Sequence, residues 1–445
     1  MASYEFDDRE TVEQALNTAQ AAFQIWRDMT CDERAVRLVS VANELRAGKT
    51  RFARLITTEM GKPIVESEAE IEKCAWACEY FAKEAEGFLA ERNLPSSATD
   101  SSVVFEPLGT LLGIMPWNYP FWQVFRYAAP ALMAGNVTIL KHAANVPGCA
   151  RSVEQVFRDA GVPRGVLQSL LIENHVASEL IDDDRIHCVT LTGSEGAGVS
   201  VAERSGRNLK KVVLELGGTD PFIVLADADL GEAVKTAVNA RYQNTGQSCI
   251  AAKRIILDSE IADEFTEQFV GAVTSLKTGD PLDRDTKVGP VAREDLLKGL
   301  EMQIHESANK GATILVGGSR GDTPGFFLEP TVLSDVCPGM PAFDEELFGP
   351  VASLIRVQGS DEAVTMANRS RFGLGAAVWT GDVAGGRLLA RRLEAGSVFV
   401  NGMVASDPRL PMGGIKRSGF GRELGEYGIR EFTNVKTVWV GPRRD

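Results

Sequence analysis

Four short segments of this chain hold side chains whose types and spacing could carry out chemistry. The first, TGQSC at residues 245–249, sets Cys249 in a glycine-containing turn after a helical pattern over 230–242. A substrate can approach such a turn closely, and a thiolate attacks carbonyl carbons well at neutral pH. Any cysteine taken alone is more often simply buried than reactive. Cys249 is therefore a candidate nucleophile that needs partners.

The second segment, VLELGG at 213–218, places Glu215 within an apolar, strand-like run. Burial disfavours the charged form of a carboxyl group, so the pKa of Glu215 would rise toward the working range of a general base. Two other interpretations stay open: a solvent-facing glutamate at a strand end, or the ribose-binding acid of a dinucleotide-binding unit that begins at 193–198. The glycines of that loop follow a GxxGxG pattern, which differs from the GxGxxG fingerprint.

The third segment, GIMPWNYP at 113–120, holds Asn118 between two prolines. Prolines stiffen a loop, and an amide held rigidly there could donate to a developing oxyanion. The alternative is a surface turn, although turns seldom expose a tryptophan such as Trp117. The fourth feature is Lys141, with His142 beside it, at the end of an apolar strand. A lysine there suits a phosphate or ribose of a dinucleotide, and is otherwise a solvated charge.

The elements that must position these side chains change in character along the chain. Residues 8–92 are mostly helical, as the apolar spacing of three and four over 33–46 indicates. From about 103 to 225, largely apolar strands alternate with helices. This pattern predicts a parallel sheet covered on both faces, which binds ligands beyond the carboxyl ends of its strands. The expected strands are 137–141, 166–172, 186–191 and 211–216, separated by helices such as 150–160 and 198–207.

A second α/β series begins near 221–225 and runs to about 415. The tail over 432–440 roughly alternates polar and apolar residues, as a strand does. A strand so close to the terminus needs a pairing partner, for which a second subunit is one candidate. The length of 445 residues suits two or three domains. The expected strands of the second series include 253–257, 352–356, 375–379 and 397–400.

Composition excludes several classes of function. The net charge of -14 argues against a nucleic-acid binder, because affinity for a phosphate backbone depends on clustered Lys and Arg. The acidic N-terminus lacks the apolar core of a signal peptide, and no apolar run is long enough to span a bilayer, so we expect no membrane association. Seven scattered cysteines without a CxxC pair are typical of reduced thiols in a cytoplasmic protein. With four histidines and no ligand cluster, we expect no metal site.

Taken together, the four segments occur in the order and spacing of one family. The chain resembles the aldehyde dehydrogenase superfamily over nearly its whole length, and 141–147 and 401–403 look like its short, NADP-type succinate-semialdehyde dehydrogenases. The motifs that carry the resemblance are PWN at 116–118, LTGS at 191–194, ELGG at 215–218, GQSC at 246–249, EELFGP at 345–350 and PMGGIKRSG at 411–419.

The resemblance implies an α/β fold with two doubly wound domains and a small β oligomerisation flap. The implied dinucleotide-binding domain comprises 1–98 and 111–216, and the catalytic domain 217–415. The oligomerisation strands would be 99–110 with 425–443. We accordingly expect a homo-oligomer, either a dimer or a tetramer.

The resemblance assigns Cys249 as the nucleophile, Glu215 as the general base and Asn118 as the oxyanion donor. An aldehyde gives up hydride only after a nucleophile has made its carbon tetrahedral, so these side-chain types agree with the assignment. The presence of Glu215 favours hydrolysis of the resulting thioester over transfer of the acyl group to coenzyme A or phosphate. The implied activity is the NAD(P)-dependent oxidation of an aldehyde.

For the dinucleotide, the resemblance implies that Lys141 and Glu346 bind the riboses and that Phe348 packs against the nicotinamide. Many NAD-preferring members carry Glu at the position of Ala144, where it binds the 2′-hydroxyl and repels a 2′-phosphate. NADP is therefore favoured here, and NAD is permitted. The complete set of implied cofactor contacts is Trp117, Asn118, Lys141, His142, Ala143, Ala144, Gly193, Ser194, Leu216, Glu346 and Phe348.

Arg126, eight residues after Asn118, occupies the position at which succinate-semialdehyde dehydrogenases present an arginine to the substrate carboxylate. Ser406 matches a second carboxylate contact. An arginine fork grips a carboxylate with two hydrogen bonds, although Arg126 could also be an exposed helix residue. One departure is Gln243, where some members carry a second substrate arginine. We expect succinic semialdehyde as substrate, with glutarate semialdehyde, an uncharged aldehyde or a non-catalytic role as alternatives.

Overall fold

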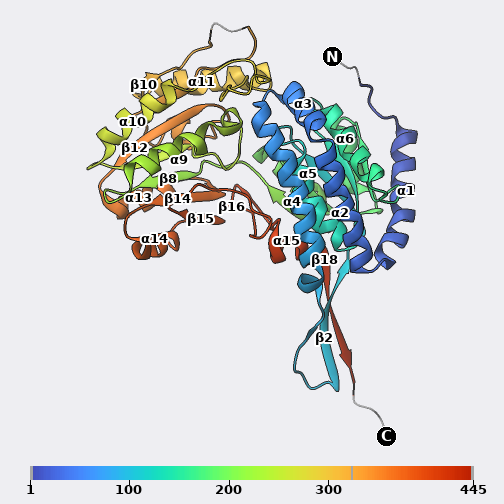
Figure 1. The fold of residues 1–445 in the computed structure, drawn as a ribbon. Coiled ribbons are helices and arrows are strands. Elements are labelled where there is room, and N and C mark those ends of the chain that lie inside the picture. The colour runs from blue at the N-terminus through green and yellow to red at the C-terminus, as the bar shows by residue number, and fades with distance from the viewer. Residues whose placement is uncertain (1–3, 322–323, 442–445) are drawn as a thin grey trace.

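The computed structural model describes residues 4–321 and 324–441. Two α/β lobes lie side by side, and a long antiparallel ribbon projects from the first of them (Figure 1). The blue-to-green lobe carries the N-terminal helices, and the yellow-to-orange lobe holds the second series of strands. Residues 1–3 and 442–443, which we assign from the sequence to the first domain and the terminal strand, lie outside the described residues.

The N-terminal region is helical, as predicted. Its helices are α1 (Arg9–Asp28), α2 (Cys31–Ala47), α3 (Lys49–Met60) and α4 (Ile64–Leu89). Their ends follow from local chemistry, since Thr30 forms a capping box with Glu33 at the start of α2. Gly61, in the left-handed region at φ 89°, ends α3. Helix α4 packs against α2 and α5 (Trp122–Met133), which places it beside the first sheet.

The first sheet has the strand order β17-β7-β6-β3-β4-β5. All neighbours are parallel except β17, which pairs antiparallel with β7. The sheet confirms the predicted doubly wound layer. Its strands are β3 (Thr110–Met115), β4 (Val137–His142), β5 (Leu167–Leu170), β6 (Ile186–Thr192), β7 (Lys211–Glu215) and β17 (Gly419–Phe420). Its helices are α5 (Trp122–Met133), α6 (Pro147–Asp159), α7 (Asn174–Asp182) and α8 (Glu195–Arg207).

Strand β3, near the centre of this sheet, is not among the strands expected from the sequence. Gly113 interrupts its apolar run, and glycine ordinarily weakens a strand. Here a Cβ at residue 113 would lie 2.1 Å from the Tyr127 hydroxyl oxygen. The absence of a side chain at Gly113 therefore lets α5 pack directly on the sheet. The same glycine interrupts the apolar pattern by which the strand could have been predicted.

The second sheet has the order β10-β11-β12-β9-β8-β14-β15, with every pair parallel except β10 and β11. The chain passes from the first sheet to the second between Glu215 and Pro221. The strands are β8 (Pro221–Val224), β9 (Arg254–Asp258), β10 (Thr313–Val316), β11 (Thr331–Ser334), β12 (Val351–Val357), β14 (Gly375–Trp379) and β15 (Ser397–Val400). The helices are α9 (Leu230–Tyr242), α10 (Ala262–Thr274), α11 (Glu294–Asn309), α12 (Pro341–Asp344), α13 (Gly359–Asn368) and α14 (Val383–Ala390).

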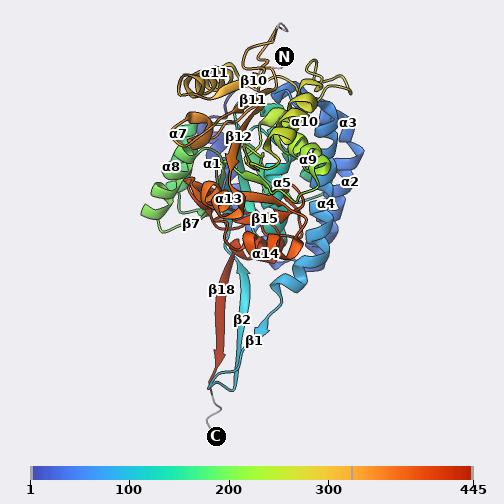
Figure 2. The ribbon, with the colours of Figure 1, turned by 90° about the vertical axis from the view of Figure 1, so that its left-hand side faces the viewer.

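The projecting ribbon is antiparallel, in the order β1 (Arg92–Asn93), β2 (Asp100–Pro107) and β18 (Thr433–Val440). Figure 2 shows β2 and β18 extending together beyond both lobes. Every residue of β18 after Thr433 is exposed, and β18 forms one edge of this small sheet. Helix α15 (Gly425–Glu431) precedes β18, and the short strands β13 (Phe372–Gly373) and β16 (Ile415–Lys416) pair near the second sheet. The predicted fold of two doubly wound domains with a small β flap is confirmed.

Within residues 4–321 and 324–441, none of the helices combines the length and the apolar character that crossing a bilayer requires. The same residues contain no group of three or more His, Cys, Asp or Glu side chains arranged to hold a metal ion.

Candidate functional site

Cys249 follows a turn whose backbone takes an unusual conformation. After α9, Asn244, Thr245 and Gly246 have φ angles of 54°, 57° and 69°. The left-handed region is unfavourable for residues other than glycine, so such a run persists only where the surroundings fix it. At Gly246 a Cβ would lie 2.3 Å from the carbonyl oxygen of Gly349. The turn therefore requires glycine at this position.

Buried polar contacts fix the turn. The Arg241 guanidinium, which is fully buried, donates to the carbonyl oxygens of Gly246 at 3.2 Å and Val351 at 2.7 Å. The backbone N–H of Asn244 donates to the Glu66 carboxylate at 2.6 Å. Because these partners come from α9, β12 and α4, the two lobes together hold the turn in one orientation.

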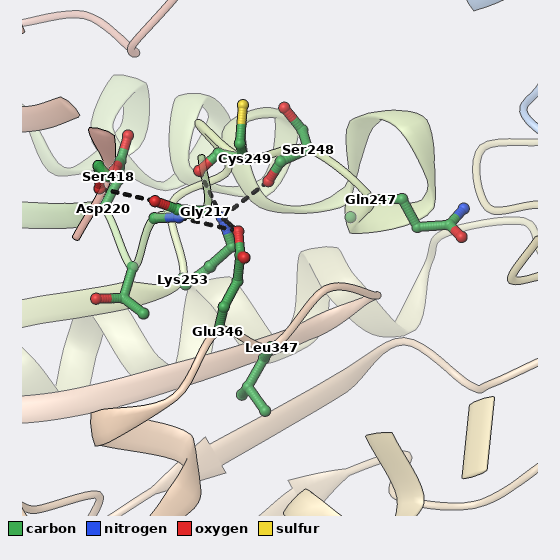
Figure 3. A network of polar contacts seen from close by, with 12 residues as sticks. Gly217, Asp220, Gln247, Ser248, Cys249, Lys253, Glu346, Leu347 and Ser418 are labelled. Atoms are coloured by element: carbon green, nitrogen blue, oxygen red, sulfur yellow. Dashed lines mark hydrogen bonds and ion pairs between the residues drawn. The ribbon is translucent and has the colours of Figure 1, made fainter. Parts of the chain in front are cut away.

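A buried lysine that the sequence did not single out joins the turn to a second loop. Lys253 Nζ donates to the carbonyl oxygens of Ser248 at 2.8 Å and Cys249 at 2.7 Å, and lies 3.2 Å from Glu346 Oε1. The Glu346 carboxylate also accepts from the backbone N–H of Gly218 at 3.1 Å. Figure 3 shows the Cys249 sulfur pointing away from these contacts. The network thus fixes the main chain of Cys249 and leaves its thiol free.

The Cys249 side chain lines two cavities. The first, of about 240 Å³, is lined by residues of α4 and α5, and we call it the α4 cavity. The second, of about 370 Å³, is lined by residues at the start of α8, and we call it the α8 cavity. Cys249 and Gln123 are common to both linings. Molecules in the two cavities can therefore reach the same sulfur.

Asn118 is held beside the nucleophile turn. Its Nδ2 donates to the backbone carbonyl oxygen of Gln247 at 3.1 Å, and its backbone carbonyl oxygen accepts from Asn244 Nδ2 at 3.0 Å. A side-chain amide has two N–H groups, and the contact with Gln247 uses one of them. Since Asn118 and Cys249 both line the α8 cavity, the second N–H can serve an oxygen held next to the sulfur.

Glu215 lies at the carboxyl end of β7 and is buried. Burial raises the pKa of this carboxyl, the charge of Arg126 lowers it and that of Glu423 raises it, and the pKa that results is about 8. The Glu215 Oε1 atom has no hydrogen-bond partner among the described residues. Glu215 is in the lining of neither cavity, and its link to the site is through Arg126, which lines the α4 cavity. A buried carboxyl with an unpartnered oxygen is suited to accept a proton from water.

The thiol of Cys249 is in the neutral form at rest. Burial raises its pKa to about 11, although the positive charges of Arg126 and Lys253 act in the opposite direction. Glu346 adds to the increase because its negative charge disfavours a thiolate. A thiol with this pKa reacts only after a base has removed its proton or a bound positive charge has stabilised the thiolate.

The α8 cavity has features that fit a dinucleotide. The rings of Trp117 and Phe348 lie edge to face with 5.8 Å between their centres, and offer an apolar wall. Ser194 caps α8, accepting from the Ala197 N–H at 3.3 Å, so the positive end of the helix dipole faces the lining residues Gly193 and Ser194. Of the predicted cofactor contacts, the cavity is lined by Trp117, Asn118, Gly193, Ser194, Leu216, Glu346 and Phe348.

The other predicted cofactor residues follow β4 and lie outside that lining. Lys141 is buried and its Nζ donates to Asn174 Oδ1 at 2.7 Å. His142 is turned inward, with Nε2 bonded to the Pro120 carbonyl oxygen at 2.7 Å and Nδ1 accepting from the Ala143 N–H. Burial lowers the pKa of His142 to about 4, so the imidazole is neutral. Ala144 is exposed, and no carboxylate occupies its position.

The α4 cavity contains both predicted substrate residues. Arg126 is fully buried, pairs through Nε with Glu423 and donates from Nη2 to Thr192 Oγ1 at 3.1 Å. The interpretation of Arg126 as an exposed helix residue is wrong. Ser406 lines the same cavity and accepts from Lys73 Nζ at 2.7 Å.

Four residues of the site were missed by sequence reasoning: Glu66, Lys73, Lys253 and Glu423. None of the four belongs to a recognisable motif in the sequence. An apolar neighbourhood was the available signal for Lys253, which stands directly before the strand β9 and is buried. Such a charge must be paired or used, because burying it alone is costly.

The chain is similar to known proteins over nearly its whole length. The model of the aldehyde dehydrogenase family matches residues 1–438. A probable NADP(+)-type succinate-semialdehyde dehydrogenase of Synechocystis sp. is 50% identical over 425 residues, which cover 96% of this chain and 94% of that protein. The NAD(P)+-type succinate semialdehyde dehydrogenase Sad of Escherichia coli is 48% identical over 428 residues, covering 96% and 93%.

The fold also matches solved structures. The crystal structure of succinic semialdehyde dehydrogenase from Streptococcus pyogenes, in complex with NADP+ as the cofactor, superposes with a TM-score of 0.97. That protein is 34% identical to this chain, and the match covers 99% of this chain and 97% of the other.

Proposed function

This chain belongs to the aldehyde dehydrogenase family, and we propose that it oxidises succinic semialdehyde to succinate with NADP as the oxidant. The observation that carries the proposal is the position of Cys249, whose side chain lines both the α4 cavity and the α8 cavity. An aldehyde in one cavity and a dinucleotide in the other would meet at this sulfur. The Synechocystis and Escherichia coli relatives, by their names, act on the same substrate.

In the first step the Cys249 sulfur adds to the aldehyde carbon and the thiol proton leaves to a base. The carbonyl oxygen becomes an oxyanion, for which the free N–H of Asn118 and the backbone N–H of Cys249 are the donors. One such donor lowers a barrier by about 3–4 kcal/mol. The bound dinucleotide supplies a two-electron acceptor for the hydride that leaves the carbon. What remains on Cys249 is a thioester.

In the second step water hydrolyses the thioester. Glu215 takes a proton from the water, the hydroxide oxygen adds to the thioester carbon, and the C–S bond breaks. The proton then passes from Glu215 to the departing sulfur, which leaves the carboxylic acid, the Cys249 thiol and the Glu215 carboxylate. The raised pKa of Glu215 matches the requirement for a base that accepts a proton near neutral pH. Its position beside the positive charge of Arg126 keeps part of the carboxyl population ionised.

For the cofactor, the residues at the start of α8 would hold the pyrophosphate and Glu346 a ribose, with Phe348 and Trp117 around the nicotinamide. Position 144 supports NADP, because Ala144 places no carboxylate where a 2′-phosphate would lie. Lys141 is the cation nearest in sequence to that position. Its Asn174 contact would have to yield to the ribose or phosphate.

For the substrate, Arg126 and Ser406 would lie near the carboxylate end of the molecule, since both line the cavity that contains Cys249.

The exposed edge strand β18 would pair with a second copy of the chain, giving a homodimer or homotetramer. We also propose a cytoplasmic location, which the free state of all seven cysteines supports.

A grid of activities on the purified protein tests the proposal. NADP and NAD are each combined with succinic semialdehyde, glutarate semialdehyde and butyraldehyde, and kcat/KM is measured for every pair. We expect the highest value for succinic semialdehyde with NADP. A higher kcat/KM for glutarate semialdehyde or for butyraldehyde would identify that aldehyde as the substrate instead. A higher kcat/KM with NAD would identify NAD as the cofactor instead.

A further inference from the structure

The α4 cavity holds a cation that the proposed mechanism does not use. Lys73 projects from α4 into the cavity, where its Nζ donates to Ser406 Oγ at 2.7 Å and lies 4.4 Å from the centre of the Trp122 ring. No carboxylate of the described residues forms an ion pair with it. The carboxyl groups that share the cavity are engaged elsewhere, Glu70 with another lysine and Glu66 with a backbone N–H. Among the described residues, Lys73 is thus a partly buried ammonium group without an ion-pair partner, although the charges of Asp407 and Glu70 act on it from a greater distance.

The Ser406 hydroxyl group also lacks a hydrogen-bond partner. A hydroxyl group can donate one hydrogen and accept two. Both acceptor positions of Ser406 Oγ are taken, by Lys73 Nζ at 2.7 Å and by the indole N–H of Trp122 at 3.1 Å. The hydroxyl hydrogen has no acceptor in the described part of the chain. Lys73 and Ser406 therefore present an N–H and an O–H donor next to each other in the cavity, which is the arrangement that an anionic oxygen requires.

Arg126 is less available to a substrate than Lys73. Its Nε is in a fully buried ion pair with Glu423, and its Nη2 is bonded to Thr192. Separating a buried ion pair leaves a charge without a partner, which is strongly unfavourable. The other position at which some family members carry an arginine is Gln243, a neutral residue that lines the same cavity.

We propose that Lys73, together with Ser406, binds the carboxylate of the semialdehyde and selects a carboxylated aldehyde over an uncharged one. The inference rests on the proposed function and adds a specificity-determining residue to it. The substrate carboxylate accepts one hydrogen bond from Lys73 and one from Ser406, with the aldehyde carbon toward Cys249 in the same cavity. Arg126 then contributes its charge from behind an ion pair, and the direct contact belongs to Lys73.

The test compares kcat/KM for succinic semialdehyde and for butyraldehyde, which has a carbon chain of the same length and no charge, with NADP present at saturation. Lys73→Met keeps most of the side-chain length and removes the ammonium group. We expect its kcat/KM for succinic semialdehyde to fall by about tenfold to hundredfold through a higher KM, because a charge-assisted hydrogen bond is lost. Its kcat/KM for butyraldehyde should change by less than about twofold.

Two further variants complete the experiment. Lys73→Arg retains the charge and should keep most of the preference for the carboxylated aldehyde. Lys83→Met is the matched control, since Lys83 lies on the same helix with an exposed side chain, and it should leave both efficiencies unchanged.

An unchanged ratio of the two efficiencies in Lys73→Met overturns the inference. An equal loss for both aldehydes also overturns it, because that is the result of a purely structural lysine. Failure of the proposed function is visible separately, in the unsubstituted protein. If that protein prefers glutarate semialdehyde, the substrate alone is corrected, and the variants are compared on that aldehyde. If it prefers butyraldehyde, both proposals are refuted.

Discussion

Replacement of Glu215 by Gln separates the two halves of the proposed reaction. The substitution keeps the size of the side chain and its ability to form hydrogen bonds, and it removes the basic oxygen. Glu215 Oε1 has no partner to lose, so the fold should tolerate the change. The first half, which forms NADPH and the thioester on Cys249, does not need Glu215 to activate water. The second half does.

The expected magnitude follows from the role and the pKa of this carboxyl. A positioned general base contributes about 10²–10⁴-fold, so the steady-state rate of Glu215→Gln should fall by that factor. Because burial raises the pKa of Glu215 to about 8, the basic form is present above that pH and is lost as the pH falls below it. If hydrolysis limits turnover, kcat should therefore rise by roughly tenfold between pH 7 and pH 9. The variant should lack this increase.

Rapid mixing with absorbance detection of NADPH is the assay. Glu215→Gln should give a burst of about one NADPH per active chain, followed by a slow steady state. Glu203→Gln is the control, since Glu203 is exposed on α8 and pairs with Arg207 on the same helix. A steady-state rate equal to that of the unsubstituted protein, at any pH from 7 to 9, would remove Glu215 from the mechanism. Loss of the burst together with the steady state would place Glu215 in the first half instead.

Three other substitutions test the proposed roles of Asn118, Lys253 and the edge strand β18. Asn118→Ala should slow the burst itself by about 10²–10³-fold in rapid mixing, because one oxyanion donor is lost before hydride leaves, and an unchanged burst would exclude this role. Lys253→Met removes a positive charge that lowers the pKa of Cys249, so alkylation of Cys249 by iodoacetamide at fixed pH should slow by about tenfold, while faster alkylation would contradict the network. In the proposed oligomer, Trp439→Lys on the exposed strand β18 should weaken the contact between copies and give smaller species in sedimentation velocity, and an unchanged sedimentation coefficient would exclude this face as the interface.

Much of the fold could be predicted from hydrophobic patterning. Strands β14 and β15 match the predicted 375–379 and 397–400 residue for residue, because apolar runs of that length between glycine-rich segments have few other structures open to them. Strand β3 could not be predicted, because Gly113 interrupts its apolar pattern. The glycine is needed to leave room for Tyr127, which lies beside it only in the folded chain. Long-range packing decided the structure there, and local propensity did not.

Some residues of the candidate site could be predicted from the sequence and others could not. Cys249, Glu215 and Asn118 could be proposed as site residues because each belongs to a local motif whose spacing is visible in the sequence. Lys73 could not, because a lone lysine on a helix is typical of a solvated face, and its partner Ser406 lies 333 positions away. The ion pair between Arg126 and Glu423 also joins distant segments, so the sequence could not show it. The sequence suggested that Arg126 is free to bind a carboxylate, whereas in the structure it is paired with Glu423.

In the proposed reaction the Cys249 sulfur forms a covalent bond with the substrate carbon. The most direct measurement mixes Glu215→Gln with succinic semialdehyde and NADP, quenches the mixture in acid, and determines the masses of the intact chain and of its peptides. We predict one succinyl group per chain, located on the peptide that contains Cys249 and absent from Cys249→Ser. Formation of NADPH without any adduct, or with the adduct on another thiol such as the exposed Cys337, would contradict the account.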